Sequence, residues 1–238
     1  AAAAAAGVVT LNAADNLNAF TLGSGFTNAV TVALTNGADT ITATEYTKAL
    51  TVTVIEADLV SGDTLTGGTG TDTLKVTFSG TALTAADLAN VSKFEGISSV
   101  TNGIGGAVLA DANIVKDGSM TINATKNTSA AFTLDAGLEL DGSIVYIGGA
   151  GVDTVTGGAK IDTIGGGAGA DVLTGNKGVD TLTGGTGADK FTYTNADQSN
   201  TAGADTIVDF VTGTDKIVIT LDQSSKSNAI TFDASVNT

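Results

Sequence analysis

The sequence predicts an all-β protein: a right-handed parallel β-roll or β-helix (a β-solenoid), with preceding Thr-rich β segments and one short helix. Two observations carry this prediction. Thr alternates with Val, Ile and Leu over much of the chain, which is typical of half-buried strands. A Gly-rich unit of nine residues then repeats five times without a break over residues 148–192. Each nonad offers one turn and one very short strand, so that two nonads make one turn of a coil.

The composition narrows the classes of function. The 238 residues carry a net charge of −15 and include no His, Cys or Pro. Such an acidic chain is poorly suited to nucleic acid or an anionic membrane surface, whereas cations are natural partners. The lack of Cys and His excludes disulfides, thiolate metal sites and the usual general base. No apolar run is long enough to predict a membrane span. Because the chain has no starting Met, we expect it to be an excerpt of a longer protein.

We divide the chain at residue 147. Residues 1–147 are expected to form a Thr/Ala-rich β domain, with strands such as 29–34 and 50–55 and one isolated nonad at 67–75. The segment 83–90 has Thr84 three residues before Asp87, which predicts one short capped helix. Residues 148–238 are expected to form the β-roll, in which the Gly-x-Asp phrases after residue 202 serve as closing turns.

The five nonads have a strict period of nine. They begin at Gly148, Gly157, Gly166, Gly175 and Gly184. The sixth position is always Asp, as Asp153, Asp162, Asp171, Asp180 and Asp189. The eighth position is always apolar, as Val155, Ile164, Leu173, Leu182 and Phe191, and we expect it to be buried.

The period places the Asp residues in two columns. Units eighteen residues apart stack at the inter-strand spacing of roughly 4.8 Å, so Asp153, Asp171 and Asp189 form one column, and Asp162 and Asp180 form the other. Stacked carboxylates repel one another unless a divalent cation lies between successive coils. Ca²⁺ is the expected cofactor because it accepts six to eight oxygen ligands in flexible geometry, whereas Mg²⁺ demands a stricter octahedron.

The array resembles the RTX (repeats-in-toxin) calcium-binding nonapeptide family, as in the unit Gly166-Gly167-Ala168-Gly169-Ala170-Asp171-Val172-Leu173-Thr174. The resemblance implies sites between stacked loops, each built from backbone carbonyls and two Asp side chains. One implied site consists of Gly149, Gly151, Asp153, Gly166, Ala168 and Asp171. The next consists of Gly167, Gly169, Asp171, Gly184, Thr186 and Asp189. The opposite column implies Gly158, Lys160, Asp162, Gly175, Lys177 and Asp180.

Some positions depart from the family pattern. Lys160 replaces the fourth-position Gly and is expected to strain the loop, whereas Asn176, in place of the second Gly, tolerates left-handed backbone. Asp205 and Asp209 resemble the closing residues of RTX arrays and are candidates for a terminal site. Asp72 of the isolated nonad is a further metal candidate. It has Val54 and Asn90, not Asp, at a distance of eighteen residues, so the alternative of a solvated Asp on a Gly loop stays open.

Three classes of function compete. The segment 67–100, with its nonad, short helix and Val91-Ser92-Lys93-Phe94-Glu95-Gly96-Ile97, is similar to Caulobacter-type RTX surface-layer proteins. That similarity implies a structural, non-enzymatic subunit exported by type I secretion to the bacterial cell surface. It also implies self-association into a lattice and, through another domain, contact with outer-membrane lipopolysaccharide. One alternative is an RTX adhesin or other cell-surface calcium-binding protein. The second is the C-terminal secretion and folding module of a type I-secreted enzyme or toxin.

Other readings of the sequence are weaker. The pairs Asp58 with Asp63, and Asp111 with Asp117, have the composition of a glycosidase acid and base, but solvation at the surface explains them better. The Thr content is compatible with an ice-binding array, yet regular outward Thr pairs are not sustained. No sequence segment has the residues of a Ser-His-Asp triad or a zinc peptidase site, because the chain has no His. We therefore expect no enzymatic activity.

Overall fold

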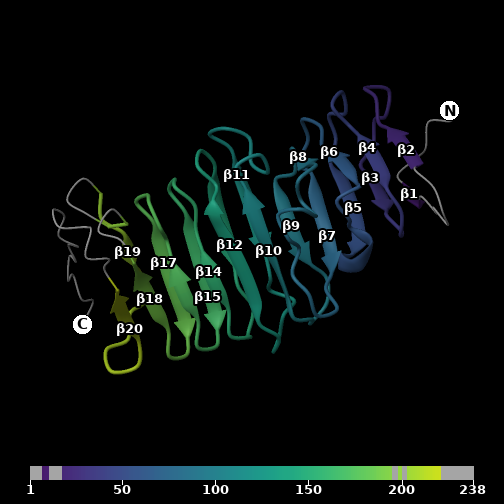
Figure 1. The fold of residues 1–238 in the computed structure, drawn as a ribbon. Coiled ribbons are helices and arrows are strands. Elements are labelled where there is room, and N and C mark those ends of the chain that lie inside the picture. Colours follow the sequence, from purple (N-terminus) through teal and green to yellow (C-terminus); the bar gives the residue numbers. More distant parts are fainter. Residues whose placement is uncertain (1–6, 11–17, 195–197, 200–202, 221–238) are drawn as a thin grey trace.

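The computed structural model describes residues 7–10, 18–194, 198–199 and 203–220, and there the chain is a parallel β-solenoid. Odd-numbered strands form a ten-stranded sheet, and even-numbered strands form a four-stranded and then a six-stranded sheet. The chain therefore crosses from one sheet to the other after each strand. Figure 1 shows the coils stacked from β1 and β2 at the N-terminal end to β19 and β20 at the C-terminal end. The predicted fold class is confirmed.

The strands are short, as expected for a chain that turns after every few residues. The ten-stranded sheet contains β1 (Gly7–Thr10), β3 (Val30–Ala33), β5 (Leu50–Ile55), β7 (Thr73–Thr77), β9 (Gly96–Ser99), β11 (Ser119–Asn123), β13 (Ser143–Ile147), β15 (Thr163–Ala168), β17 (Thr181–Thr186) and β19 (Thr206–Ile207). The four-stranded sheet contains β2 (Asn18–Thr21), β4 (Asp39–Thr42), β6 (Thr64–Thr66) and β8 (Val91–Ser92). The six-stranded sheet contains β10 (Gly105–Ala110), β12 (Phe132–Leu138), β14 (Thr154–Thr156), β16 (Val172–Thr174), β18 (Lys190–Tyr193) and β20 (Lys216–Ile219).

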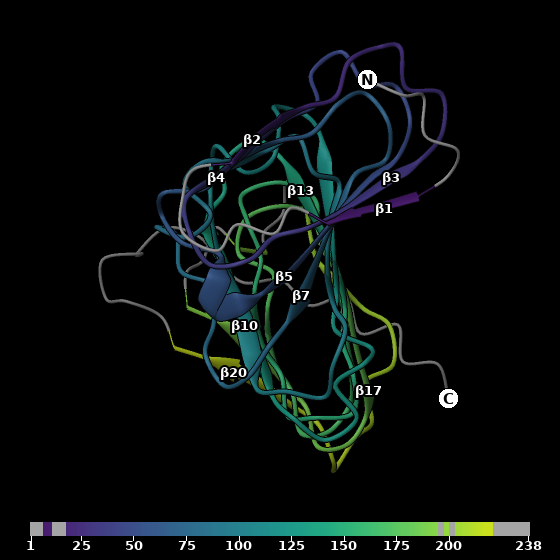
Figure 2. The ribbon, with the colours of Figure 1, turned by 90° about the vertical axis from the view of Figure 1, so that its right-hand side faces the viewer.

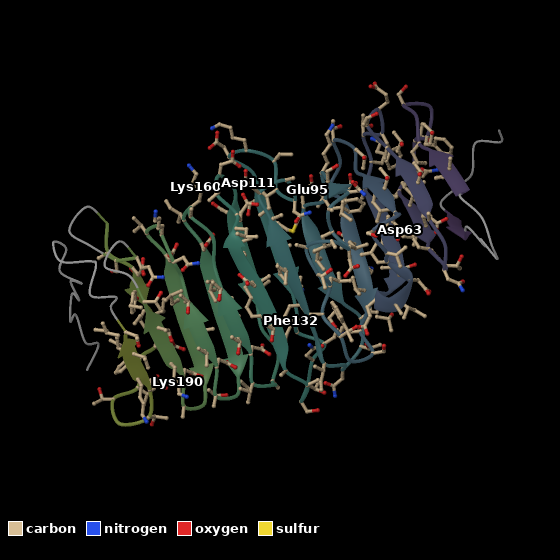
Figure 3. The ribbon with its side chains drawn as sticks, viewed as in Figure 1. Asp63, Glu95, Asp111, Phe132, Lys160 and Lys190 are labelled. Atoms are coloured by element: carbon tan, nitrogen blue, oxygen red, sulfur yellow. The ribbon has the colours of Figure 1, made fainter. Side chains whose placement is uncertain are left out.

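The core is a narrow layer between the sheet of odd-numbered strands and the two sheets of even-numbered strands. Figure 2 looks along the stack, so that successive coils overlap. Alternation decides which side chains enter it: in β3, Val30 and Val32 are buried, while Thr31 between them is only partly buried. Phe132 lies near the middle of the stack (Figure 3), and its ring packs against Phe78 and Tyr146. The apolar side chains at position eight of all five nonads are fully buried, as predicted.

Coil length changes along the solenoid. Thr163 pairs with Thr181 within the nonad array, and hydrogen bonds there join residues eighteen apart. Before the array, paired residues of successive coils are 20 to 28 residues apart, and after it they are 25 to 26 apart. The predicted closing turns do complete the stack, because β19 pairs with β17 and β20 pairs with β18. The nonads are thus the tightest part of a longer solenoid.

The division at residue 147 does not coincide with a break in the sheets. β13 ends at Ile147 and pairs with β11 on one side and with β15 on the other. β12 and β14 likewise continue the six-stranded sheet across this point. Residues before and after 147 share one stack, so their separation into two folding units stays a prediction. Residues 195–197, 200–202 and 221–238 of the second predicted domain lie outside the described residues.

The short helix predicted over 83–90 is wrong in extent, because the chain forms a run of turns there. The predicted cap is present: Thr84 N donates to Asp87 Oδ2 (2.8 Å), and Asp87 N donates to Thr84 Oγ1 (3.3 Å). A bond from Leu88 N to Thr84 O (3.2 Å) closes one helical turn. The chain then enters β8 at Val91, so no second turn follows. The described helix is a 3-10 turn, η1 (Glu56–Asp58).

Candidate metal centre

Each nonad loop returns its Asp side chain to the interior of the solenoid. All five Asp residues are at most 1% exposed. The first glycine of the loop leaves the space for the carboxylate: a Cβ at Gly166 would lie 2.3 Å from Asp171 Oδ2, and one at Gly175 would lie 2.3 Å from Asp180 Oδ2. The Gly-x-x-x-x-Asp spacing therefore folds the carboxylate under its own loop.

Hydrogen bonds show that the Asp residues stack in the two predicted columns. In the first column, Asp153 N donates to Asp171 Oδ1 (2.7 Å), and Asp171 N donates to Asp189 Oδ1 (2.9 Å). In the second, Asp162 N donates to Asp180 Oδ1 (2.8 Å). One oxygen of each carboxylate thus binds the backbone of the preceding coil, which leaves the other oxygen for a different partner.

The other oxygen, Oδ2, has no hydrogen-bond donor in the C-terminal part of the two columns. Oδ2 of Asp171, Asp180 and Asp189 is buried and unpartnered within the described part of the chain. At the N-terminal end of the columns, Oδ2 of Asp153 accepts from Tyr146 Oη (2.9 Å), and Oδ2 of Asp162 accepts from Gly158 N (2.6 Å). Buried polar atoms without a partner are rare and costly, so these three oxygens are suited to bind a ligand. A hard cation that prefers oxygen fits them.

The pKa values of the column carboxyl groups are raised. Burial, above all, raises the pKa of Asp162 and of Asp171 to about 6. Burial, together with the charges of Asp205 and Asp162, raises the pKa of Asp180 to about 8. Burial also raises the pKa of Asp205 to about 6. These shifts exist because several carboxylates share a small volume from which water is excluded.

The columns continue past the nonads. Asp180 N donates to Asp205 Oδ1 (3.0 Å), so the predicted closing residue Asp205 extends the second column. Asp209 lies over the last nonad, where its carboxylate accepts from Gly184 N (2.8 Å) and Gly185 N (2.7 Å). The residue that extends the first column is Asp215, whose Oδ1 accepts from Asp189 N (3.0 Å). We did not predict Asp215 as a site residue, although the Gly-Thr-Asp phrase that ends on it was a usable signal.

The loops adopt two backbone conformations. In the last three nonads the second and fourth positions have positive φ, including Asn176 at 67° as expected and Gly187 at 146°. The first two nonads have no positive φ at these positions. The strain expected at Lys160 is therefore wrong. Its loop instead packs on a longer coil, where Ala159 N donates to Glu139 O (2.9 Å). The Lys160 side chain is exposed at the upper edge of the solenoid in Figure 3.

The carbonyl groups implied as ligands lie along these stacked loops. Gly149 O accepts from Ala168 N, and Thr186 O accepts from Gly169 N, each at 2.8 Å. These two carbonyls thus already join successive loops. Lys160, at the fourth position of its nonad, and Lys177, at the third position of its nonad, have exposed side chains. The geometry brings the predicted loops together, and ion binding by their individual residues stays a prediction.

The isolated nonad has its own column. Leu50 N donates to Asp72 Oδ1 (2.8 Å), and Asp72 N donates to Glu95 Oε2 (2.6 Å). A spacing of eighteen residues does not identify Glu95, because the coil there spans 23 residues. Nearby, Asp63 Oδ1 accepts from Asp39 N (2.7 Å), so Asp63 has a structural role in the stack. Figure 3 shows Asp63 and Glu95 in the N-terminal half of the solenoid.

A comparison with models of protein families identifies the wider relationship. Residues 24–237 match the family described as Peptidase M10 serralysin C terminal. The chain belongs to this family. Serralysin C-terminal domains are RTX-type β-rolls that bind calcium and come from secreted proteins, so the predicted RTX resemblance is confirmed. No curated protein matches the chain. Among the described residues, no helix has the length and apolarity needed to span a membrane.

Proposed function

We propose that the chain is a structural subunit of a bacterial surface layer, in which Ca²⁺ binding between nonad coils drives folding outside the cell and then lattice assembly. The observation that carries the calcium step is the set of buried, donorless Oδ2 atoms of Asp171, Asp180 and Asp189. Membership of a calcium-binding family of secreted proteins supports the same step. Extracellular calcium sites typically bind at about 10⁻⁴ to 10⁻³ M, far above cytosolic calcium, so folding would follow export.

The structural role is supported by the continuity of the solenoid. From β1 to β20 the described chain is one stack of coils with a shared core. Such a stack offers long, regular faces for contacts between copies, and we propose a second copy of the chain as its partner. The proposal includes no catalytic activity, and it places the protein on the cell surface, with lipopolysaccharide bound through another domain.

A second candidate follows from the family match. The matched family is a C-terminal domain, so the chain is equally suited to be the calcium-folded secretion and folding module of a type I-secreted protein. In that role calcium folds the solenoid, and the folded form stays monomeric. The two candidates agree on calcium and differ on assembly. The adhesin alternative differs from both in requiring a bound host ligand.

Electron microscopy of the purified chain separates these candidates. We expect two-dimensional sheets in 10 mM Ca²⁺ and none in chelator or in 10 mM Mg²⁺, which controls for ionic strength and divalent charge. Circular dichroism of the same samples reports folding independently. A chain that folds with Ca²⁺ and remains monomeric by light scattering would overturn the lattice role and favour the secretion module.

A further inference from the structure

Three acidic side chains outside the nonads meet at one edge of the six-stranded sheet. Asp111 directly follows β10, and Glu139 directly follows the neighbouring strand β12. Ala110 pairs with Leu138 in the register of these two strands, so the next residues of both chains, Asp111 and Glu139, leave the sheet together. Asp141 follows two residues later. Figure 3 shows Asp111 at this end of the strands, where Lys160 of the nonad loop also lies.

The three carboxylates have the separation of ligands to a single ion. One oxygen from each of Asp111, Glu139 and Asp141 lies within 4.8 Å of the other two. Two oxygens bound to the same Ca²⁺ are at most about 5 Å apart, since each Ca–O distance is roughly 2.3–2.6 Å. The three carboxylates are therefore close enough to share a single Ca²⁺.

Glu139 supplies the second, independent observation. Its side chain is 0% exposed, and its Oε2 has no hydrogen-bond partner in the described part of the chain. The other oxygen, Oε1, accepts from Gly142 N (2.9 Å) and Asp141 N (3.2 Å), which fixes the carboxylate in the loop. Burial, together with the charges of Asp111 and Asp141, raises the pKa of Glu139. A buried oxygen without a donor, beside two further acids, lacks a positive partner.

No basic side chain supplies that partner among the described residues. The ion pair present in this region joins Lys116 to Asp117 (3.0 Å), and both side chains are at least 70% exposed. Lys116 is also within electrostatic reach of Asp141 but makes no ion pair with it. The site opens to solvent through Asp111, which gives a hydrated ion access.

We propose that Asp111, Glu139 and Asp141 form a Ca²⁺ site separate from the nonad columns. The site borders the second column, because Ala159 N of the adjacent nonad loop donates to Glu139 O (2.9 Å). It thus links the last two long coils, beside the first tight nonad coil. An ion there holds together the ends of β10 and β12. It also neutralises the charge of Glu139, which otherwise acts on Asp162 of the second column. The proposal does not depend on lattice assembly or on ion binding by the nonads.

The number of Ca²⁺ ions bound per chain tests the proposal. We expect equilibrium dialysis of the full chain at saturating Ca²⁺ to give one ion fewer for Asp111→Asn/Asp141→Asn than for the wild type. Both positions are at least partly exposed, and Asn at 111 keeps the oxygen that accepts from Leu140 N, so the fold should persist. Asp135→Asn is the matched control, because it removes one exposed charge from β12 outside the cluster.

The same measurement in an Asp171→Asn background separates this site from the nonads. We expect the cluster substitutions again to remove one ion there, in addition to those lost with Asp171. Asp111→Asn alone, measured by the same dialysis, should weaken the site if the double variant does not fold. Equal numbers and affinities of bound ions in the wild type and the cluster variants would overturn the proposal. Loss of an ion in Asp135→Asn as well would also overturn it.

Discussion

Without calcium, the β structure of the nonad segment 148–192 is expected to weaken steeply as the pH rises from about 5 to about 8. The folded, calcium-free chain raises the pKa of Asp162, Asp171 and Asp205 to about 6 and that of Asp180 to about 8. The folded state therefore binds more protons than the unfolded state in this window. By linkage, its stability is greatest below the ordinary Asp pKa and is lost as the pH passes the raised values. The change at Asp171 alone, from 3.8 to about 6, corresponds to roughly 3 kcal/mol. That is a large share of a domain's net stability of about 5–15 kcal/mol.

Hydrogen exchange in chelator, resolved by peptide, measures this effect. Protection over residues 148–192 should be present at pH 5 and lost at pH 7.5, and addition of Ca²⁺ at pH 7.5 should restore it. Asp180→Asn removes the group with the highest pKa, so it should flatten the pH dependence in chelator. Protection in chelator that stays constant, or that increases with pH, would contradict the buried-carboxylate account.

Substitution of Asp171 is expected to have opposite effects with and without calcium. Asp171 lies between Asp153 and Asp189, and the RTX resemblance assigns its carboxylate to two successive ions. Loss of those ions at 10 mM Ca²⁺ should cost roughly 1.5–3 kcal/mol each, for dissociation constants of about 10⁻⁴ to 10⁻³ M. In chelator, Asp171→Asn should instead stabilise the segment, because a buried, unpaired carboxylate becomes a neutral amide.

Denaturant unfolding followed by hydrogen exchange of residues 148–192 tests both signs. Asn keeps the oxygen that accepts from Asp153 N, so the comparison isolates charge from shape. Asp135→Asn, which changes the net charge equally at an exposed position, should alter stability by less than about 0.5 kcal/mol in either condition. Destabilisation by Asp171→Asn to the same extent in calcium and in chelator would indicate a structural role without an ion.

The repeat explains why the array could be predicted from the sequence. A period of nine fixes which residues stack, so the two Asp columns and the buried eighth positions follow from residue spacing alone. Strand positions such as β3 and β5 also follow, because apolar and Thr residues alternate through them. These features depend on local pattern and on one constant coil length.

Variable coil length explains what could not be predicted. Glu95 stacks on Asp72 across 23 residues and Asp215 on Asp189 across 26, and no constant spacing identifies such pairs. The cluster at Glu139 depends on the register between β10 and β12, which includes a shift between Val108 and Ala110. The Lys160 loop has no positive φ, and it packs on a longer coil through the bond from Ala159 N to Glu139 O. Each feature that the sequence did not predict involves a coil that is not eighteen residues long.

A crystal structure grown in Ca²⁺, with anomalous scattering used to locate the ions, tests the central claim most directly. We predict an ion between successive nonad coils in each column, bound by Oδ2 of Asp171, Asp180 and Asp189. Asp171 should contact ions on both of its sides. Columns that contain only water, with the three Oδ2 atoms hydrogen-bonded to it and no anomalous peak, would contradict the claim.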